Sequence, residues 1–221
     1  MKVSVIITCF NLEKYVSRAI NSCIHQTLED DQYEIIVVDD ASSDKSWEVI
    51  GSFGTLVKAH RHDDNLGVAA ASNTGIRNAR GKYIVRVDGD DFINKHFLHT
   101  LTQFLDWNED MGFVYCDHIV VNESLERKQS MNTLEKLLDH GAGVMFRKKH
   151  LQEIGLYDET LRNREDYDLI LRHIKKFKNL DRHHVRLPYY RYFKREGSLS
   201  TDFEAREEIK NKIDERENVK N

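Results

Sequence analysis

Short, continuous apolar runs alternate with amphipathic stretches through the first half of the chain. Three runs rich in Val and Ile lack polar alternation, which is typical of strands covered on both faces of a sheet; they occupy residues 3–8, 33–40 and 83–87, and residues 56–62 are the candidate third strand between them. Helical spacing of apolar residues predicts helices between them, over 15–23, 42–53 and 65–81. The order β-α-β-α-β-α-β predicts a doubly wound, mostly parallel α/β sheet flanked by helices.

Polar residues at the ends of these helices are the candidate caps. Asn11 is the candidate cap of the first helix, Ser42 and Ser43 are those of the second, and Gly81 ends the third.

The second half of the chain is less regular. Its pattern predicts a helix over 96–107, a strand over 112–121, a short helix over 134–140, a strand leading into a helix over 141–155, a helix over 164–177, and a strand or hairpin pair over 183–193. From Asp202 onward charged residues dominate, which predicts a solvated helix or a frayed tail. The single proline, Pro188, marks no boundary, so we expect one domain followed by a charged segment, 201–221.

Polar residues follow three of the predicted strands. They are Thr8 to Asn11, the pair Asp39–Asp40, and the run Asp88 to Asp91. Because ligands bind at the carboxyl ends of the strands in such sheets, we expect these residues to converge on one crevice.

The run "VDGDD" places three carboxylates, Asp88, Asp90 and Asp91, directly after a buried strand. Two unit charges about 4 Å apart repel by about 4 kcal/mol at the effective dielectric near a protein surface. The nearest basic residues are Arg86 and Lys95. Carboxylates suit Mg²⁺ or Mn²⁺, and glycine at position 89 permits a tight turn. The alternative is an acidic loop that caps the helix beginning near Asn94.

Two further acidic pairs each allow two interpretations, one functional and one structural. Asp39 and Asp40 can accept hydrogen bonds from an imide N–H or from ribose hydroxyls, or they can belong to a helix cap. Glu165 and Asp166 can supply a general base, or they can simply be favoured at a helix start by the helix dipole. The residue pattern alone leaves both alternatives open.

Composition narrows the class of protein. Hydrophobic residues make up 40% of the 221, enough for a packed core, and the formal charge of −4 disfavours a nucleic-acid binder. Three widely spaced cysteines (Cys9, Cys23 and Cys116) indicate reduced core thiols. The N-terminus lacks a signal-peptide pattern and no apolar run reaches 18 residues. We therefore expect a soluble cytoplasmic protein, with contact at the inner face of a membrane left open.

The segments together resemble the family 2 glycosyltransferases, inverting enzymes with a GT-A fold. The resemblance covers nearly all of residues 2–200 and rests on six segments in the family's order: "VSVIITCFN", "IIVVDDASSDKS", "NLGVAAASNTGIRNARGKYIVRVDGDD", "GAGVMFRKKHLQEIGLYDE", "REDYDLILR" and "YYRYFKREGSLS". The resemblance implies that residues 1–92 bind a nucleotide-sugar, usually UDP-linked, and that 93–200 form the acceptor side. The acceptor would be a saccharide, a lipid-linked molecule or a protein, and a homodimer is possible.

The resemblance also implies residue roles. Thr8, Phe10 and Asp39 would hold the base of the donor, and Asp40 or Asp88 its ribose. Asp90, with Asp91 as the neighbouring candidate, would bind Mn²⁺ or Mg²⁺. Asp166 would be the general base, with Glu165 beside it. The remaining donor-side positions of these motifs are Asn11, Ser42, Asn65, Gly67, Ser72, Asn73 and Gly89.

This chain departs from the family pattern at two places. Ser72 stands where the family often has Arg, and Lys194 and Arg195 occupy the neighbourhood of a His that can approach the metal. The two basic residues would neutralise the diphosphate directly and reduce the dependence on metal. The alternatives are a family member that binds a sugar nucleotide without turnover, or a sugar-phosphate nucleotidyltransferase. The second of these would need a Gly-rich basic signature after the first strand, which "TCFNLEKYV" lacks.

Overall fold

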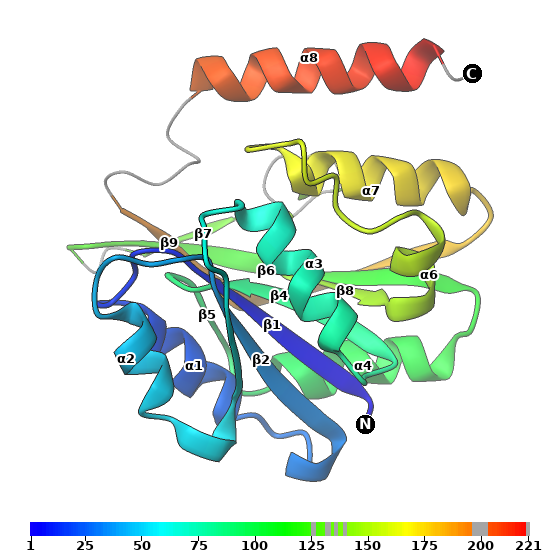
Figure 1. Ribbon diagram of the computed structural model, residues 1–221. Helices are drawn as coiled ribbons and strands as arrows, with labels where there is room; N and C mark the ends of the chain where they lie inside the picture. The colour runs from blue at the N-terminus through cyan, green and yellow to red at the C-terminus, as the bar shows by residue number, and fades with distance from the viewer. Residues whose placement is uncertain (125–126, 131–133, 135–136, 139–140, 196–202, 220–221) are drawn as a thin grey trace.

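A mixed β-sheet forms the centre of the molecule (Figure 1). The computed structural model describes residues 1–124, 127–130, 134, 137–138, 141–195 and 203–219. Within them the sheet has nine strands in the order β3-β2-β1-β4-β8-β6-β9-β5, with β7 paired to β6. The strands are β1 (Val3–Cys9), β2 (Tyr33–Asp39), β3 (Lys58–Arg61), β4 (Tyr83–Asp88), β5 (Phe92–Ile93), β6 (Met111–Asn122), β7 (Arg127–Ser130), β8 (Val144–Arg147) and β9 (Asp181–Lys194).

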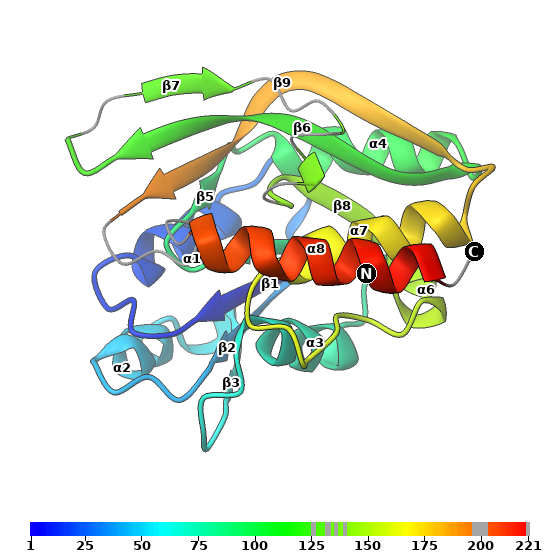
Figure 2. The same ribbon diagram turned by 90° about the horizontal axis from the view of Figure 1, so that it is seen from above.

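Helices cover both faces of this sheet (Figures 1 and 2). The described helices are α1 (Val16–Ile24), α2 (Ser46–Gly51), α3 (Val68–Asn78), α4 (Phe97–Trp107), α6 (Lys148–Glu153), α7 (Glu165–Lys176) and α8 (Phe203–Val219), with 3-10 turns at Asp30–Gln32 and Gly54–Leu56. One face packs against α1, α2 and α4, and the other against α3, α6 and α7. Helix α8 lies outside α7 and forms a further layer (Figure 1).

The strands divide their side chains between two hydrophobic cores. On β1, Val5 and Ile7 pack toward α1, whereas Ile6 packs toward α3. Every residue of β1 and β2 is buried. The prediction of strands covered on both faces is therefore confirmed for these two strands.

The register of the parallel strands places their polar ends side by side. Strand β1 pairs with β2 so that Cys9 lies opposite Asp39, and with β4 so that Thr8 lies opposite Asp88. Beyond β4 the sheet changes direction, because β8 runs antiparallel to β4 and to β6. Strands β6 and β9 are again parallel to each other, so this half of the sheet is mixed. The parallel half therefore ends along one edge, and the mixed half brings α7 toward that edge.

Two predicted helix starts are wrong. Asn11 does not cap α1, which begins at Val16 without a side-chain cap. Instead Asn11 adopts a left-handed backbone (φ 53°), and its Oδ1 accepts from the backbone N–H of Ser43 at 2.8 Å. Helix α2 begins at Ser46 rather than Ser42, because residues 42–45 form a turn in which Asp44 Oδ1 accepts from the Ser46 N–H at 2.9 Å.

The predicted strand or hairpin pair over 183–193 is one strand, β9, of 14 residues, which confirms the first of the two alternatives. Pro188, which has no N–H to donate, lies at an irregularity in the pairing of β9 with β6, opposite Asp117. Strands β5 and β7 were not predicted. Of the predicted helix 134–140, Leu134, Leu137 and Leu138 are helical and the other residues lie outside the described set.

The charged C-terminal segment forms helix α8, confirming the first of its two predicted forms. No helix among the described residues is long and apolar enough to cross a membrane.

The close packing of α3 on β1 gives a stability prediction. A Cβ at Gly75 would lie 2.4 Å from Ile6 Cγ2, a buried branched side chain with little room to move. We expect Gly75→Ala to lower the free energy of unfolding by about 1–3 kcal/mol in urea denaturation, despite the better helix propensity of Ala. Gly51→Ala is the matched control in α2, because a Cβ there has no neighbour within 4 Å. Equal effects of the two changes would contradict the packing argument.

Candidate functional site

A cavity of about 520 Å³ opens at the carboxyl ends of β1 and β4, within the size range of small-molecule sites. Most of its lining comes from the turn after β1, the start of α3, the end of β4 and the segment that leads into α7; single residues after β2, in and after β9, and in α8 complete it. The lining residues are Thr8, Cys9, Phe10, Asn11, Leu12, Asp40, Asn65, Gly67, Val68, Ala71, Arg86, Asp88, Gly89, Asp90, Arg162, Asn163, Arg164, Glu165, Asp166, Tyr167, Tyr192, Arg195 and Arg206. The predicted convergence is confirmed for Thr8 to Asn11, Asp40 and Asp88 to Asp90, whereas Asp39 and Asp91 do not line the cavity.

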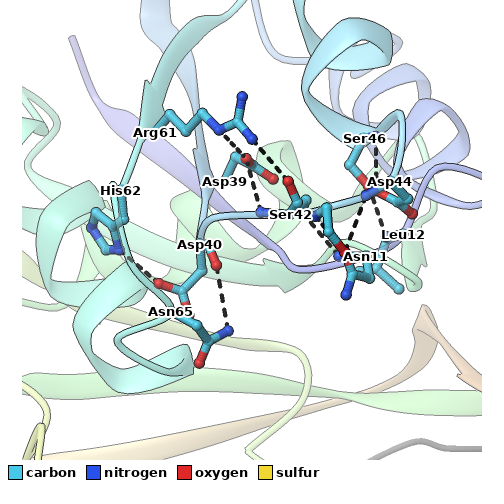
Figure 3. Close-up of polar contacts among 11 residues, drawn as sticks. Asn11, Leu12, Asp39, Asp40, Ser42, Asp44, Ser46, Arg61, His62 and Asn65 are labelled. Carbon is cyan, nitrogen blue, oxygen red and sulfur yellow. Dashed lines mark hydrogen bonds and ion pairs between the residues drawn. The ribbon is translucent and has the colours of Figure 1, made fainter.

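Asp39 ends β2 with a carboxylate that is fully buried and only partly satisfied. Its Oδ2 lies 3.1 Å from Arg61 Nε and accepts from the Ser42 N–H at 3.3 Å (Figure 3). Its Oδ1 has no hydrogen-bond partner within the described part of the chain. Because an unsatisfied buried acceptor costs about 1–3 kcal/mol, this oxygen is suited to receive a donor N–H from a ligand. Asp39 does not itself line the cavity, but its chain neighbour Asp40 and its cross-strand neighbour Cys9 do.

Asp40 orders the loop that leads to α3. Its two oxygens accept from the N–H groups of Leu66 (2.9 Å) and Gly67 (2.7 Å). Oδ1 also lies 2.7 Å from Nδ1 of His62 (Figure 3). Asn65 donates to the Asp40 carbonyl at 3.3 Å. Since both Asp40 oxygens are already occupied, this residue shapes the cavity wall more than it offers free acceptors.

The turns after β1 and β2 are tied together. Ser42 Oγ accepts from the Asn11 N–H at 2.9 Å, and Ser46 Oγ accepts from the Leu12 N–H at 2.8 Å (Figure 3). These bonds fix the main chain around Phe10, whose side chain remains 45% exposed at the cavity. An exposed aromatic ring in this position can stack on a flat ligand group.

Two of the three clustered aspartates face the cavity. Asp88 pairs with Arg86 Nε at 3.0 Å, and Thr8 Oγ1 lies 3.4 Å from Asp88 Oδ1. Asp90 pairs with Arg195 Nε at 2.8 Å. Burial and the nearby Asp88 raise the pKa of Asp90, against the opposing effect of Arg195. Gly89 is required between them because a Cβ there would lie 2.7 Å from the Thr8 carbonyl oxygen.

Asp91 turns away from the cavity. Its Oδ2 accepts from the Tyr190 hydroxyl and its Oδ1 from the Phe193 N–H, both at 2.7 Å, and the residue is 2% exposed. Burial, Asp90 and Asp88 raise its pKa well above the ordinary value. This placement attaches β9 to the turn after β4 and does not favour the predicted metal-binding role of Asp91.

The acidic turn offers few ligands for a metal ion. No group of three or more His, Cys, Asp or Glu side chains suited to a metal occurs among the residues that the structure describes. Asp90 and Asp88 nevertheless fit a Mg²⁺ or Mn²⁺ ion of the kind held by one or two carboxylates and completed by substrate phosphates.

The acids at the start of α7 reach the same cavity from the opposite side. Glu165 Oε1 accepts from Arg86 Nη1 at 2.9 Å, and Asp166 Oδ2 accepts from Arg86 Nη2 at 2.8 Å. Burial raises the pKa of Asp166 to about 8; Arg86 opposes this shift, while Glu165 and Asp88 add to it. A carboxylate with a pKa near neutrality is well matched to proton transfer.

Five residues predicted for the donor site do not line the cavity: Asp39, Ser42, Ser72, Asn73 and Lys194. Ser72 donates to the Val68 carbonyl at 2.7 Å within α3. Asn73 exchanges hydrogen bonds with the backbone of Tyr157 and joins α3 to the segment before α7. Lys194 is exposed at the end of β9. Of the two basic residues predicted there, only Arg195 lines the cavity.

Several cavity residues were absent from the predicted site: Arg86, Arg162, Arg164, Tyr192 and Arg206. Strand alternation places residues 86 and 88 on the same face, so Arg86 could have been identified from the sequence. Arg206 could not, because it reaches the cavity only through the docking of α8 on α7.

A parallel half with an acidic turn after its last strand, and a mixed half with two acids at a helix start, define a protein of the GT-A fold. Residues 4–197 match the family model described as glycosyl transferase family 2. The chain belongs to this family.

Relatives and solved structures agree with that assignment. An uncharacterized glycosyltransferase of Rickettsia prowazekii is 33% identical over 186 residues, which cover 76% of this chain and 57% of the relative. Staphylococcus aureus TarS 1–349 in complex with UDP-GlcNAc matches with a TM-score of 0.77 and 26% identity, over 91% of this chain and 61% of that chain. Mannosyltransferase PcManGT from Pyrobaculum calidifontis, in complex with GDP-Man and Mn²⁺, shares the fold: TM-score 0.68, 18% identity, 87% of this chain and 56% of that chain.

The different placements of Asp91 and Asp90 give a second prediction. Asp91→Ala leaves the Tyr190 hydroxyl and the Phe193 N–H without their acceptor, so we expect a loss of about 2–4 kcal/mol in the free energy of unfolding. Asp90→Ala should change it by less than about 1 kcal/mol, because it removes one partly exposed ion pair. Urea denaturation of both variants provides the measurement, and the reverse order of effects would contradict the assigned placements.

Proposed function

We propose that this chain is the catalytic domain of a metal-assisted, inverting glycosyltransferase that moves a sugar from a nucleotide-diphospho-sugar to an acceptor hydroxyl. The observation that carries the proposal is the meeting of Asp88, Asp90 and Asp166 on one cavity, from elements about 80 residues apart in the chain. A UDP-linked donor is supported by TarS, which has been solved with UDP and with UDP-GlcNAc.

The donor would lie along the ends of β1, β2 and β4. Thr8 and Phe10 would contact the base, and the unsatisfied Oδ1 of Asp39 would accept its imide N–H. Asp88 suits the ribose hydroxyls better than Asp40, since Asp40 already accepts from two backbone N–H groups. In this proposal residues 1–92 form the donor half and residues 93–200 the acceptor half.

The departing nucleoside diphosphate gains negative charge that the site must offset. Asp90 would hold Mn²⁺ or Mg²⁺, which when bound supplies Lewis-acid stabilisation of that charge. PcManGT, solved with GDP-Man and Mn²⁺, supports a divalent ion. Arg195 lies against Asp90 and would add its fixed positive charge on the same side of the cavity.

Asp166 would act as the general base. It would take the proton from the acceptor hydroxyl as that oxygen attacks the anomeric carbon, while the bond from this carbon to the diphosphate breaks. One direct displacement inverts the anomeric centre and needs no covalent intermediate. A positioned base contributes typically 10²–10⁴-fold.

The acceptor is proposed as a chemical class, by comparison with TarS. TarS is a poly(ribitol-phosphate) β-N-acetylglucosaminyltransferase. The present chain spans about 57% of its Rickettsia prowazekii relative. We propose a saccharide, lipid-linked or protein acceptor, met in the cytoplasm or at the inner face of a membrane, by a monomer or a homodimer.

A thermal-shift series tests the donor site directly. UDP, GDP, CDP and dTDP are each added with Mn²⁺, Mg²⁺ or EDTA. We expect UDP with a divalent ion to raise Tm, since a ligand at 100 times its Kd stabilises the folded state by about 2.7 kcal/mol. A shift that persists in EDTA would assign the diphosphate to Arg195 instead of a metal. Failure of all four nucleotides to shift Tm would contradict the proposed donor.

The raised pKa of Asp166 predicts the pH dependence of transfer. The base must be ionised, so kcat/KM should fall about tenfold per pH unit below a pKa of about 8 and level off above it. Asp166→Asn should reduce kcat by 10²–10⁴-fold and remove this limb, with UDP binding changed less than about threefold. Glu165→Gln is the comparison variant, and it should retain the limb. An Asn variant with wild-type kcat would show that Asp166 is not the base.

A further inference from the structure

Arg86 links the two sides of the cavity. All three of its guanidinium nitrogens meet carboxylates: Nε meets Asp88 at 3.0 Å, Nη1 meets Glu165 at 2.9 Å, and Nη2 meets Asp166 at 2.8 Å. The side chain is only 12% exposed, and the guanidinium lies 5.5 Å from the centre of the Tyr157 ring. We propose that Arg86 is a positioning residue: it fixes the position of the candidate base, Asp166, relative to the donor side of the cavity.

The chemistry of arginine explains why this position holds arginine. A planar guanidinium has fixed donor directions, so three carboxylates bound to it are fixed relative to one another. Asp88 comes from the end of β4, whereas Glu165 and Asp166 come from the start of α7. A lysine ammonium has a similar charge but no fixed fork, so it could attract these acids without setting their geometry.

The charge balance around Arg86 gives it a second effect. One cation faces three acids, and burial adds to the cost of ionising all of them. Arg86 lowers the pKa of Asp166, against burial, Glu165 and Asp88, which raise it. Among the described residues, Tyr157 before α7 is a further titratable group that interacts with Asp166, and Arg164 and Arg206 line the same cavity. The backbone of Gly141 packs against the Asp166 side chain.

The consequence is that the donor side and the base are not independent. A ligand that binds Asp88 changes the contact of Asp88 with Arg86, the same guanidinium that pairs with Asp166. Arg86 therefore couples the state of the donor site to the position and ionisation of the base. The kinetic part of this inference rests on the proposed function, whereas the contact network does not.

The first test uses the protein without substrates. Aspartate is labelled with ¹³C at the carboxyl carbon, the Asp166 signal is assigned with Asp166→Asn, and its titration is followed by NMR. Arg86→Gln should move the Asp166 midpoint upward by about 1–3 pH units, because an adjacent positive charge is lost. Arg195→Gln is the matched control: it removes an arginine from Asp90 and should leave the Asp166 midpoint in place. An unchanged midpoint in Arg86→Gln would overturn the proposal.

The second test separates positioning from charge. Arg86→Lys keeps the positive charge, and it provides the test should Arg86→Gln fail to fold; thermal unfolding checks both variants. We expect Arg86→Lys to lower kcat about 10²-fold, the scale of a base displaced by about 1 Å, with the donor KM changed less than about threefold. Wild-type kcat in Arg86→Lys would overturn the positioning role. If Asp166→Asn retains full activity, the proposed base is wrong, and the NMR titration still decides whether Arg86 controls Asp166.

Discussion

The site depends on the register of three parallel strands. Strand β1 pairs with β2 up to Cys9–Asp39 and with β4 up to Thr8–Asp88. The three strands therefore end side by side at the same edge of the sheet. Each exit supplies a polar turn, and each turn is held by bonds to its neighbour, as Ser42 Oγ holds the Asn11 N–H (Figure 3). A one-residue slip would send alternate side chains to the opposite face of the sheet, so the cavity and the core require the same register.

The three clustered aspartates coexist because each has a different partner. Arg86 meets Asp88, Arg195 meets Asp90, and the Tyr190 hydroxyl meets Asp91. Two of these partners come from β9 and the segment that follows it. The acidic turn is thus also the point where the mixed half of the sheet is attached to the parallel half. The aspartates that remain at the cavity are the two that pair with arginine.

The sequence predicted the parallel half well and the acidic turn incompletely. Continuous apolar runs mark β1, β2 and β4 without ambiguity, since their burial on both faces is a local property of composition. Three neighbouring aspartates look alike in a sequence, however, and the orientation of Asp91 depends on Tyr190, 99 positions away. Asn73 was misplaced for the same reason, because its partner Tyr157 lies 84 positions away. Local patterns identify which residues approach the site, and long-range pairing decides which of them face it.

Helix α8 shows how the last wall of the cavity depends on distant contacts. The helix is charged on nearly all sides, and such a helix is rarely stable alone. Its Ile213 is buried, and it is held on α7 by the bond from the Tyr167 hydroxyl to Asp214 and by Arg216, which pairs with Asp168 and with Asp158 before α7. These contacts place Arg206 at the cavity next to the start of α7. The outer face of α7 therefore helps to form the site by binding α8, although the ion pair of Asp168 with Arg216 does not line the cavity.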